Sequence, residues 1–309
     1  MTALQNKPSR VKKKVRLALT ASAAAVLLVL MVLGAKWLRG TEGVQDFLIQ
    51  YTGHSALPAG APVGLPPWLG WQHFLNGFFL LLIVRTGWQV RTTTRPGAYW
   101  TRNNKGLIKT KGAPKKISLD LWFHLSLDAL WVLNGIVFMV LLFVTNQWMR
   151  IVPTSWDIVP NAASAMLQYA SFNWPLESGW VNYNALQVLA YFLTVFVAAP
   201  LALISGLRMS PAWPKNTVWL NKAFPIEAAR ALHLPVMLYF VAFVAVHVTL
   251  VLITGALHNL NHMYAGRNDG SWLGAGIFAG SLAVMVAAWF MARPLFLRPI
   301  ASLTGKVSR

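Results

Sequence analysis

Four histidines lie inside long apolar segments of the sequence, where an ionisable side chain is costly. They are His73, His124, His233 and His247. Ionisable residues within the hydrocarbon of a membrane are rare and usually functional, so each is a candidate site residue. The alternative is four unrelated histidines whose hydrogen bonds are satisfied in the protein interior. Their spacing argues for a shared function.

His233 and His247 are fourteen residues apart in one apolar segment. In an α-helix this spacing leaves the two side chains within about 40° of the same face and separates them by about 21 Å along the axis. One helix therefore presents two ligands, one above the other. Each of the two centres needs another ligand from a different helix.

The elements that must position these residues are six apolar segments. The chain has 309 residues, of which 56% are hydrophobic and only 11% are charged, so it cannot solvate the surface of an ordinary soluble domain. A helix of about 20 apolar residues crosses the hydrocarbon core. We therefore predict an all-α, polytopic membrane protein with six transmembrane helices, at about 17–38, 67–90, 118–148, 184–207, 229–257 and 272–293.

The basic residues predict the orientation of these helices. Of the 27 lysines and arginines, all but Lys36, Arg39, Arg150 and Arg267 fall in four segments on one side. The positive-inside rule places those segments, and with them both termini, in the cytoplasm. We expect a multi-pass protein of the cytoplasmic membrane with a disordered basic tail before Leu17. Its net charge of +19 then reflects topology and contact with anionic lipid, not nucleic-acid binding.

This topology pairs the four histidines by depth. His73 follows the outer end of the second span closely, and His247 lies in the outer half of the fifth. His124 follows the inner end of the third span, and His233 lies near the inner end of the fifth. We expect His73 to face His247 and His124 to face His233.

The absence of cysteine restricts the chemistry of these pairs. It excludes disulfides, iron–sulfur clusters, thiolate zinc sites and covalently attached c-type haem. Zinc usually takes three or four protein ligands, whereas each pair supplies two imidazoles. Two facing imidazoles in a helix bundle suit a low-spin haem b. We therefore predict that the four histidines are the iron ligands of two non-covalent, bis-histidine haem b groups.

Two glycines fit the same arrangement. Gly87 lies fourteen residues after His73, at the depth of the inner pair, and Gly135 lies eleven residues after His124, at the depth of the outer pair. Glycine lets a helix backbone approach a flat ring closely, so both are candidate cofactor-binding residues. The alternative is ordinary packing, because membrane helices are rich in glycine.

Several charged residues lie close to the inner pair. Arg85, Arg91 and Arg230 could neutralise haem propionates or extend to lipid headgroups. Asp128 could accept a hydrogen bond or relay a proton, or it could pair with a nearby tryptophan, asparagine or serine.

The histidine pattern resembles the bacterial dihaem cytochrome b family, which includes cytochrome b561, the gamma subunit of formate dehydrogenase and the cytochrome b of nickel–iron hydrogenase. The resemblance lies in the segments RALHLPVMLYFVAFVAVHVTLVLITG, WLGWQHFLNGFFLLLIV and LDLWFHLSLDALWVLNG. It implies a four-helix, dihaem core at 67–262. The remaining segments would be a basic cytoplasmic tail at 1–16, an extra helix with an outer loop at 17–66, and a last helix with a cytoplasmic tail at 263–309.

The resemblance implies an electron-transfer subunit rather than a stand-alone enzyme. Such a protein passes electrons between the quinone pool and a partner oxidoreductase, such as a molybdenum-cofactor or iron–sulfur protein. Analogy places a quinone beside one haem, where His258, Asn259 and His262 could contribute, unless they are solvated residues at a helix end. In the formate dehydrogenase relatives the helix equivalent to that of His73 starts in the cytoplasm, so an added first span would invert the core.

Two other functions are compatible with intramembrane histidines. A transporter would use them as a proton path, and it would carry broken helices and a polar pore. A cofactor-free membrane anchor would only recruit a partner.

Overall fold

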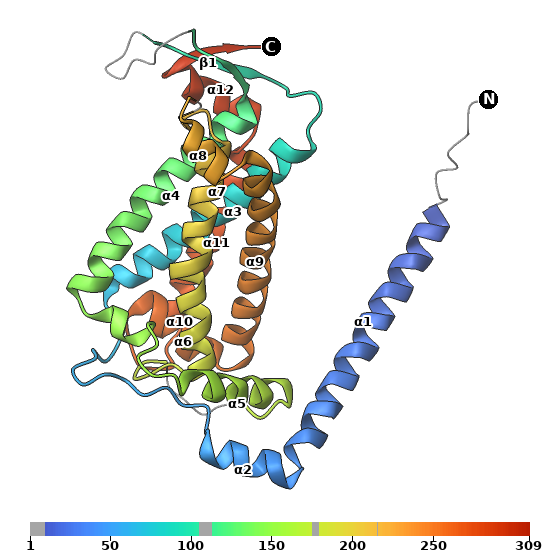
Figure 1. Ribbon diagram of the computed structural model, residues 1–309, viewed down its shortest axis with the longest axis vertical. Coiled ribbons are helices and arrows are strands. Elements are labelled where there is room, and N and C mark those ends of the chain that lie inside the picture. The colour runs from blue at the N-terminus through green and yellow to red at the C-terminus, as the bar shows by residue number, and fades with distance from the viewer. Residues whose placement is uncertain (1–9, 105–112, 175–178, 215) are drawn as a thin grey trace. The chain divides into compact units, whose positions relative to one another are not determined.

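The computed structural model describes residues 10–104, 113–174, 179–214 and 216–309. Six of its helical segments are long and apolar enough to span a membrane: Lys14–Arg39, Pro67–Thr92, Leu119–Val144, Ala185–Met209, Ile226–Ile253 and Leu273–Met291. They confirm the predicted all-α, polytopic membrane fold (Figure 1). The first helix, α1 (Arg10–Arg39), begins earlier than expected, so residues 10–16 are helical. The rest of the expected tail, 1–9, lies outside the described residues.

The chain divides into two compact units. The first contains α1, α2 (Glu42–Gln50), α5 (Ile158–Ala170) and the start of α6 (Ala185–Phe192). Ile158, Ala162, Ala185 and Val188 form its apolar core. The backbone N–H of Gly53 donates to Asn161 Oδ1 at 3.0 Å, which ties the loop after α2 to α5.

The second unit contains the helices that carry the four histidines. They are α3 (Pro67–Thr92), α4 (Leu119–Val144) and α9 (Ile226–Ile253), and α7 (Ala199–Met209), which carries no histidine, lies in the same unit. Backbones approach most closely within two helix pairs, α3 with α4 and α7 with α9. Leu80 of α3 packs against the cluster formed by Ala198, Val236 and Phe240, which brings side chains of α3 and α9 into one apolar core. A π-helical segment, η2 (Leu193–Ala198), joins α6 to α7.

Local sequence determines where these helices begin and end. Ser118 caps α4, because its hydroxyl accepts the N–H of Leu121 at 3.1 Å. Helix α9 begins directly after Pro225 and ends just before Gly255, whose φ of 139° suits glycine only. The shorter elements of the unit are η1 (Gln147–Arg150), α8 (Val218–Ala223), α10 (Ala256–Leu260), η3 (Asn261–Ala265), α11 (Leu273–Met291) and α12 (Pro294–Ser302).

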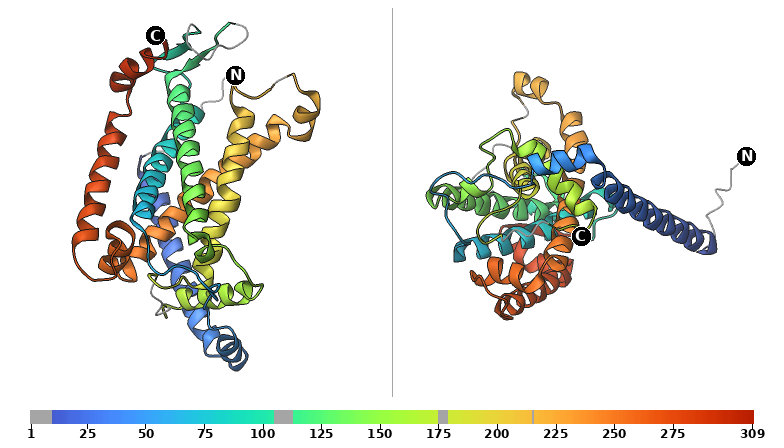
Figure 2. Two further views of the ribbon diagram at one scale, coloured as in Figure 1. Left: turned by 90° about the vertical axis from the view of Figure 1, so that its left-hand side faces the viewer. Right: turned by 90° about the horizontal axis from the view of Figure 1, so that it is seen from below.

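A small antiparallel sheet covers one end of α4 and was not predicted. Its strand order is β2 (Lys116–Ser118), β1 (Tyr99–Arg102), β3 (Gly305–Ser308). Trp100 Nε1 donates to the carbonyl of Ala301 at 3.0 Å, and Ala98, Leu119 and Leu297 form a buried cluster beneath the sheet. In Figure 2, α11 and α12 run along the α3–α4 pair to reach it.

The connection between α9 and α11 is organised by one buried asparagine. Asn261 is fully buried, its Nδ2 donates to Asp269 Oδ1 at 2.7 Å, and its Oδ1 accepts the N–H of Gly274 at 2.6 Å. At Gly70 of α3 an added Cβ would lie 2.6 Å from the carbonyl oxygen of Met263. Glycine there lets η3 lie directly against α3, close to His73.

Candidate functional site

The structure brings His73 of α3 and His247 of α9 together. Their ring centroids are 6.0 Å apart and the planes are inclined at 53°. His73 Nδ1 is buried and has no hydrogen-bond partner. Metal–imidazole bonds are about 2 Å long, so two rings that share one metal have centroids roughly 6 Å apart. The separation of this pair is therefore the one expected for a shared metal ion.

Aromatic rings surround the His73–His247 pair. Phe243, one turn before His247, stacks on its ring with centroids 5.6 Å apart and planes at 5°. Tyr191 meets His247 edge-on at 6.1 Å, and Tyr264 of η3 meets His73 edge-on at 5.7 Å. Burial raises the pKa of Tyr264, so its phenol stays protonated at neutral pH. The described side chains in ring contact with this pair are aromatic.

His124 is held by a threonine on the neighbouring helix. Thr86 Oγ1 lies 2.9 Å from His124 Nδ1 and 2.8 Å from the carbonyl oxygen of Leu82. A hydroxyl has one proton, and the backbone carbonyl can only accept it. The hydroxyl therefore accepts from Nδ1–H, which leaves Nε2 as the unprotonated nitrogen of His124.

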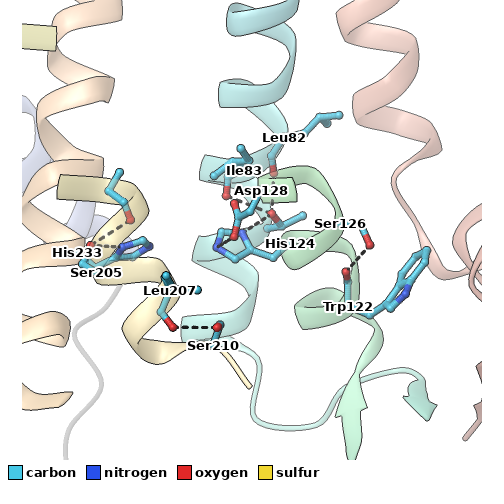
Figure 3. A network of polar contacts seen from close by, with 12 residues as sticks. Leu82, Ile83, Trp122, His124, Ser126, Asp128, Ser205, Leu207, Ser210 and His233 are labelled. Carbon is cyan, nitrogen blue, oxygen red and sulfur yellow. Dashed lines mark hydrogen bonds and ion pairs between the residues drawn. The ribbon is translucent and has the colours of Figure 1, made fainter. Parts of the chain in front are cut away.

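His233 is held in the same way by a serine of α7. Ser205 Oγ lies 2.9 Å from His233 Nδ1 and 2.6 Å from the carbonyl oxygen of Leu201. The same argument assigns the proton to Nδ1 and leaves the lone pair on Nε2. Figure 3 shows His233 with Ser205 on one side and His124 with Asp128 on the other.

His233 interacts electrostatically with both His124 and Asp128, so the three groups share one region. The carboxylate of Asp128 lies 3.6 Å from His124 Nε2, which is too long for a hydrogen bond. Among the described residues, no group of three or more histidine and carboxylate side chains is arranged to hold a metal ion.

The comparisons with known proteins found one informative relative. The chain is similar to a reductase subunit. That relative is the "Putative protein-methionine-sulfoxide reductase subunit YedZ1" of Azospira oryzae, at 27% identity over 205 residues, which cover 60% of this chain and 88% of the relative. No family model and no solved structure matches.

The two predicted glycines occupy different surroundings. An added Cβ at Gly87 would lie 3.2 Å from His124 Cε1, so glycine permits the close approach of that ring. At Gly135 an added Cβ would meet no atom within 4 Å. Its neighbour Asn134 donates to Asn76 of α3 at 3.3 Å, which places Gly135 near the level of His73.

Three residues of the His124–His233 region were not predicted from the sequence: Thr86, Ser205 and Gly206. An added Cβ at Gly206 would lie 3.4 Å from His233 Cε1, the counterpart of Gly87 at His124. Hydroxyl residues in membrane helices commonly bond the carbonyl one turn back, as both do here. The shared signal in the sequence is a hydroxyl residue followed by glycine within a span.

Other candidate residues have structural partners. Arg85 Nη1 donates to the carbonyl of Trp289 at 2.6 Å and its guanidinium lies over the Trp289 ring, while Arg91 and Arg230 are exposed. His262 is buried rather than solvated, and Asn268 Oδ1 lies 2.8 Å from its Nε2. Burial lowers the pKa of His262, so its ring is neutral at pH 7.

Proposed function

We propose that the protein is a membrane b-type cytochrome subunit with two haem groups, one between His73 and His247 and one between His124 and His233. It transfers electrons between the quinone pool and a partner oxidoreductase. The observation that carries the proposal is the grouping of four histidines in two pairs: the rings of His73 and His247 lie 6.0 Å apart, and His124 and His233 interact electrostatically. The two members on α9 are fourteen residues apart.

The residues present fit this cofactor. His124 and His233 keep Nε2 unprotonated, and the rings of His73 and His247 are separated by the distance that a shared iron requires. The α3–α4 and α7–α9 pairs supply one histidine each to both sites. A haem bound at either site would therefore be held by one histidine from each helix pair.

A bound haem supplies one-electron redox chemistry, and the chain sets its surroundings. The fourteen-residue spacing on α9 separates the two ligation levels by about 21 Å. Phe243 and Tyr239 stack between these levels with centroids 6.2 Å apart. Aromatic side chains of α9 therefore lie in the interval between the two sites.

A partner supplies the two-electron chemistry in this proposal. The chain has no cysteine, so it cannot hold an iron–sulfur cluster of its own. The similar protein of Azospira oryzae is named as a subunit of a protein-methionine-sulfoxide reductase, which supports an analogous role beside a catalytic subunit. The basic segments support cytoplasmic placement of both termini in the cytoplasmic membrane.

Addition of a quinol to oxidised membranes that contain the protein tests the electron-transfer function. We expect b-type absorption bands to appear, because electrons enter from the quinone pool. Membranes from cells that lack the protein are the control. If dithionite develops the bands and the quinol does not, the quinone part of the proposal is wrong. If neither reductant develops them, the haem part is wrong, which leaves a proton path or a cofactor-free anchor.

Gly135 provides a further prediction for the His73–His247 site. Leucine at this position adds a large side chain where an added Cβ meets no protein atom. We expect Gly135→Leu to lower the content of one haem only, because the side chain occupies space needed by the macrocycle. Gly276→Leu is the matched control, since a Cβ there also meets nothing within 4 Å. Equal haem content in both variants would show that Gly135 faces lipid.

A further inference from the structure

Two short sequence motifs hold the members of the His124–His233 pair in the same way. Thr86–Gly87 of α3 faces His124, and Ser205–Gly206 of α7 faces His233. In each motif the hydroxyl oxygen lies 2.9 Å from the Nδ1 of the histidine. The following glycine leaves room for the Cε1 edge of the same ring. We call these motifs the two hydroxyl–glycine cradles.

The cradles are built into the protein interior. Thr86 is 1% exposed and Ser205 is fully buried. Both hydroxyls are fixed a second time by the carbonyl one turn back, that of Leu82 or Leu201. Neither hydroxyl can turn away without leaving a buried polar group unsatisfied, which is unfavourable. The orientation of each imidazole is therefore set by the neighbouring helix.

The His73–His247 pair has no counterpart of these cradles in the described part of the chain. His73 Nδ1 is buried without a hydrogen-bond partner. His247 is oriented by stacking on Phe243. The two pairs therefore differ in the hydrogen bonding of their ligands, although all four ligands are histidines.

This difference has an electronic consequence for a bound iron. An imidazole that donates its Nδ1–H is a more basic ligand at Nε2, and a more basic ligand favours the oxidised metal. The carboxylate of Asp128, 3.6 Å from His124 Nε2, would add negative charge to the same site. Arg85, the basic residue nearest in sequence to Thr86, donates to the carbonyl of Trp289 and interacts electrostatically with Arg293 and Asp120.

We propose that Thr86–Gly87 and Ser205–Gly206 are positioning motifs that fix His124 and His233 as Nδ1-protonated ligands and give this site the lower reduction potential of the two. The proposal rests on the proposed function, because it concerns haem ligands. It gives the chain an internal order of potentials along α9.

Redox titration of purified variants, followed by visible absorption, tests the proposal. Thr86→Val and Ser205→Ala each remove one hydroxyl with little change in volume. We expect the lower midpoint potential to rise in each variant, to rise further in the double variant, and the higher midpoint to stay unchanged. A change in the electron paramagnetic resonance signal of one ferric haem should accompany the shift, because one of the hydrogen bonds that orient the ligand ring is lost. Thr86→Ser restores the hydroxyl and should restore the lower midpoint.

Ser126→Ala is the matched control. Ser126 belongs to the same helix as His124, but its hydroxyl donates to the carbonyl of Trp122 at 2.8 Å, away from the histidine (Figure 3). We expect both midpoints to stay at their wild-type values. If the wild-type protein shows two midpoints and Thr86→Val and Ser205→Ala leave both unchanged, or move only the higher one, the proposal is wrong while the proposed function stands. If the wild-type protein binds no haem, the proposed function itself fails.

Discussion

Replacement of His247 by alanine is expected to halve the haem content of the purified protein. The reason is that each haem needs two axial imidazoles and His73 alone supplies one. His73→Ala should remove the same haem, and His124→Ala and His233→Ala should each remove the other. The pyridine haemochrome spectrum, divided by protein concentration, measures the content of each variant.

Double variants test the pairing itself. The pair His73→Ala with His247→Ala should retain one haem, like either single change, because both residues hold one group. The pair His233→Ala with His247→Ala should retain none, although both residues lie on α9. His258→Ala is the control, since this exposed histidine belongs to neither pair and should leave two haems. Equal haem content in the two double variants would contradict the assigned pairs.

Gly274→Ala is expected to lower the thermal stability of the detergent-solubilised protein strongly. A Cβ on Gly274 would overlap the backbone of Leu260 and Asn261, which cannot move aside as a side chain can. Overpacking of this kind typically costs about 1–3 kcal/mol and sometimes more. Displacement of this backbone should also disturb the hydrogen bond in which Asn261 Oδ1 accepts the Gly274 N–H. It should disturb η3 as well, which carries Tyr264 against His73. The apparent melting midpoint measures the effect.

Gly276→Ala, two residues along the same helix, separates this clash from a change in helix propensity. An added Cβ at Gly276 meets no atom within 4 Å. Alanine is favoured over glycine in a helix by up to about 1 kcal/mol, so this variant should melt at or above the wild-type temperature. An equal decrease of the melting midpoint in both variants would mean that the close contact at Gly274 is not the cause of the lost stability.

The six spans could be predicted because each is a long uninterrupted apolar run, but their ends depend on local detail. Helix α1 reaches back to Arg10 through a basic stretch, which helices accommodate because lysine and arginine are good helix formers. Helix α9 ends before Gly255, earlier than hydropathy indicated. The small sheet was missed because β1 pairs with β3, about two hundred residues away, and no local pattern encodes such a pairing.

At the candidate site, the pairing of histidines could be predicted because depth in a membrane follows from sequence position and topology. The residues that surround the histidines could not be predicted. Thr86 and Ser205 carry the same residue types as many hydroxyls that bond only their own helix. From the sequence, His262 could be either a contact of a quinone or a solvated residue at a helix end. In the structure the connection after α9 folds back around Asn261, and His262 is buried.

Haem content and spectrum of the purified, unmodified protein test the central claim most directly. We predict two haem b groups per chain, with a reduced-minus-oxidised spectrum of the b type and two midpoint potentials. A protein that is folded, as judged by its helical circular dichroism, and that contains no haem or only one would contradict the assignment of four histidine ligands to two sites.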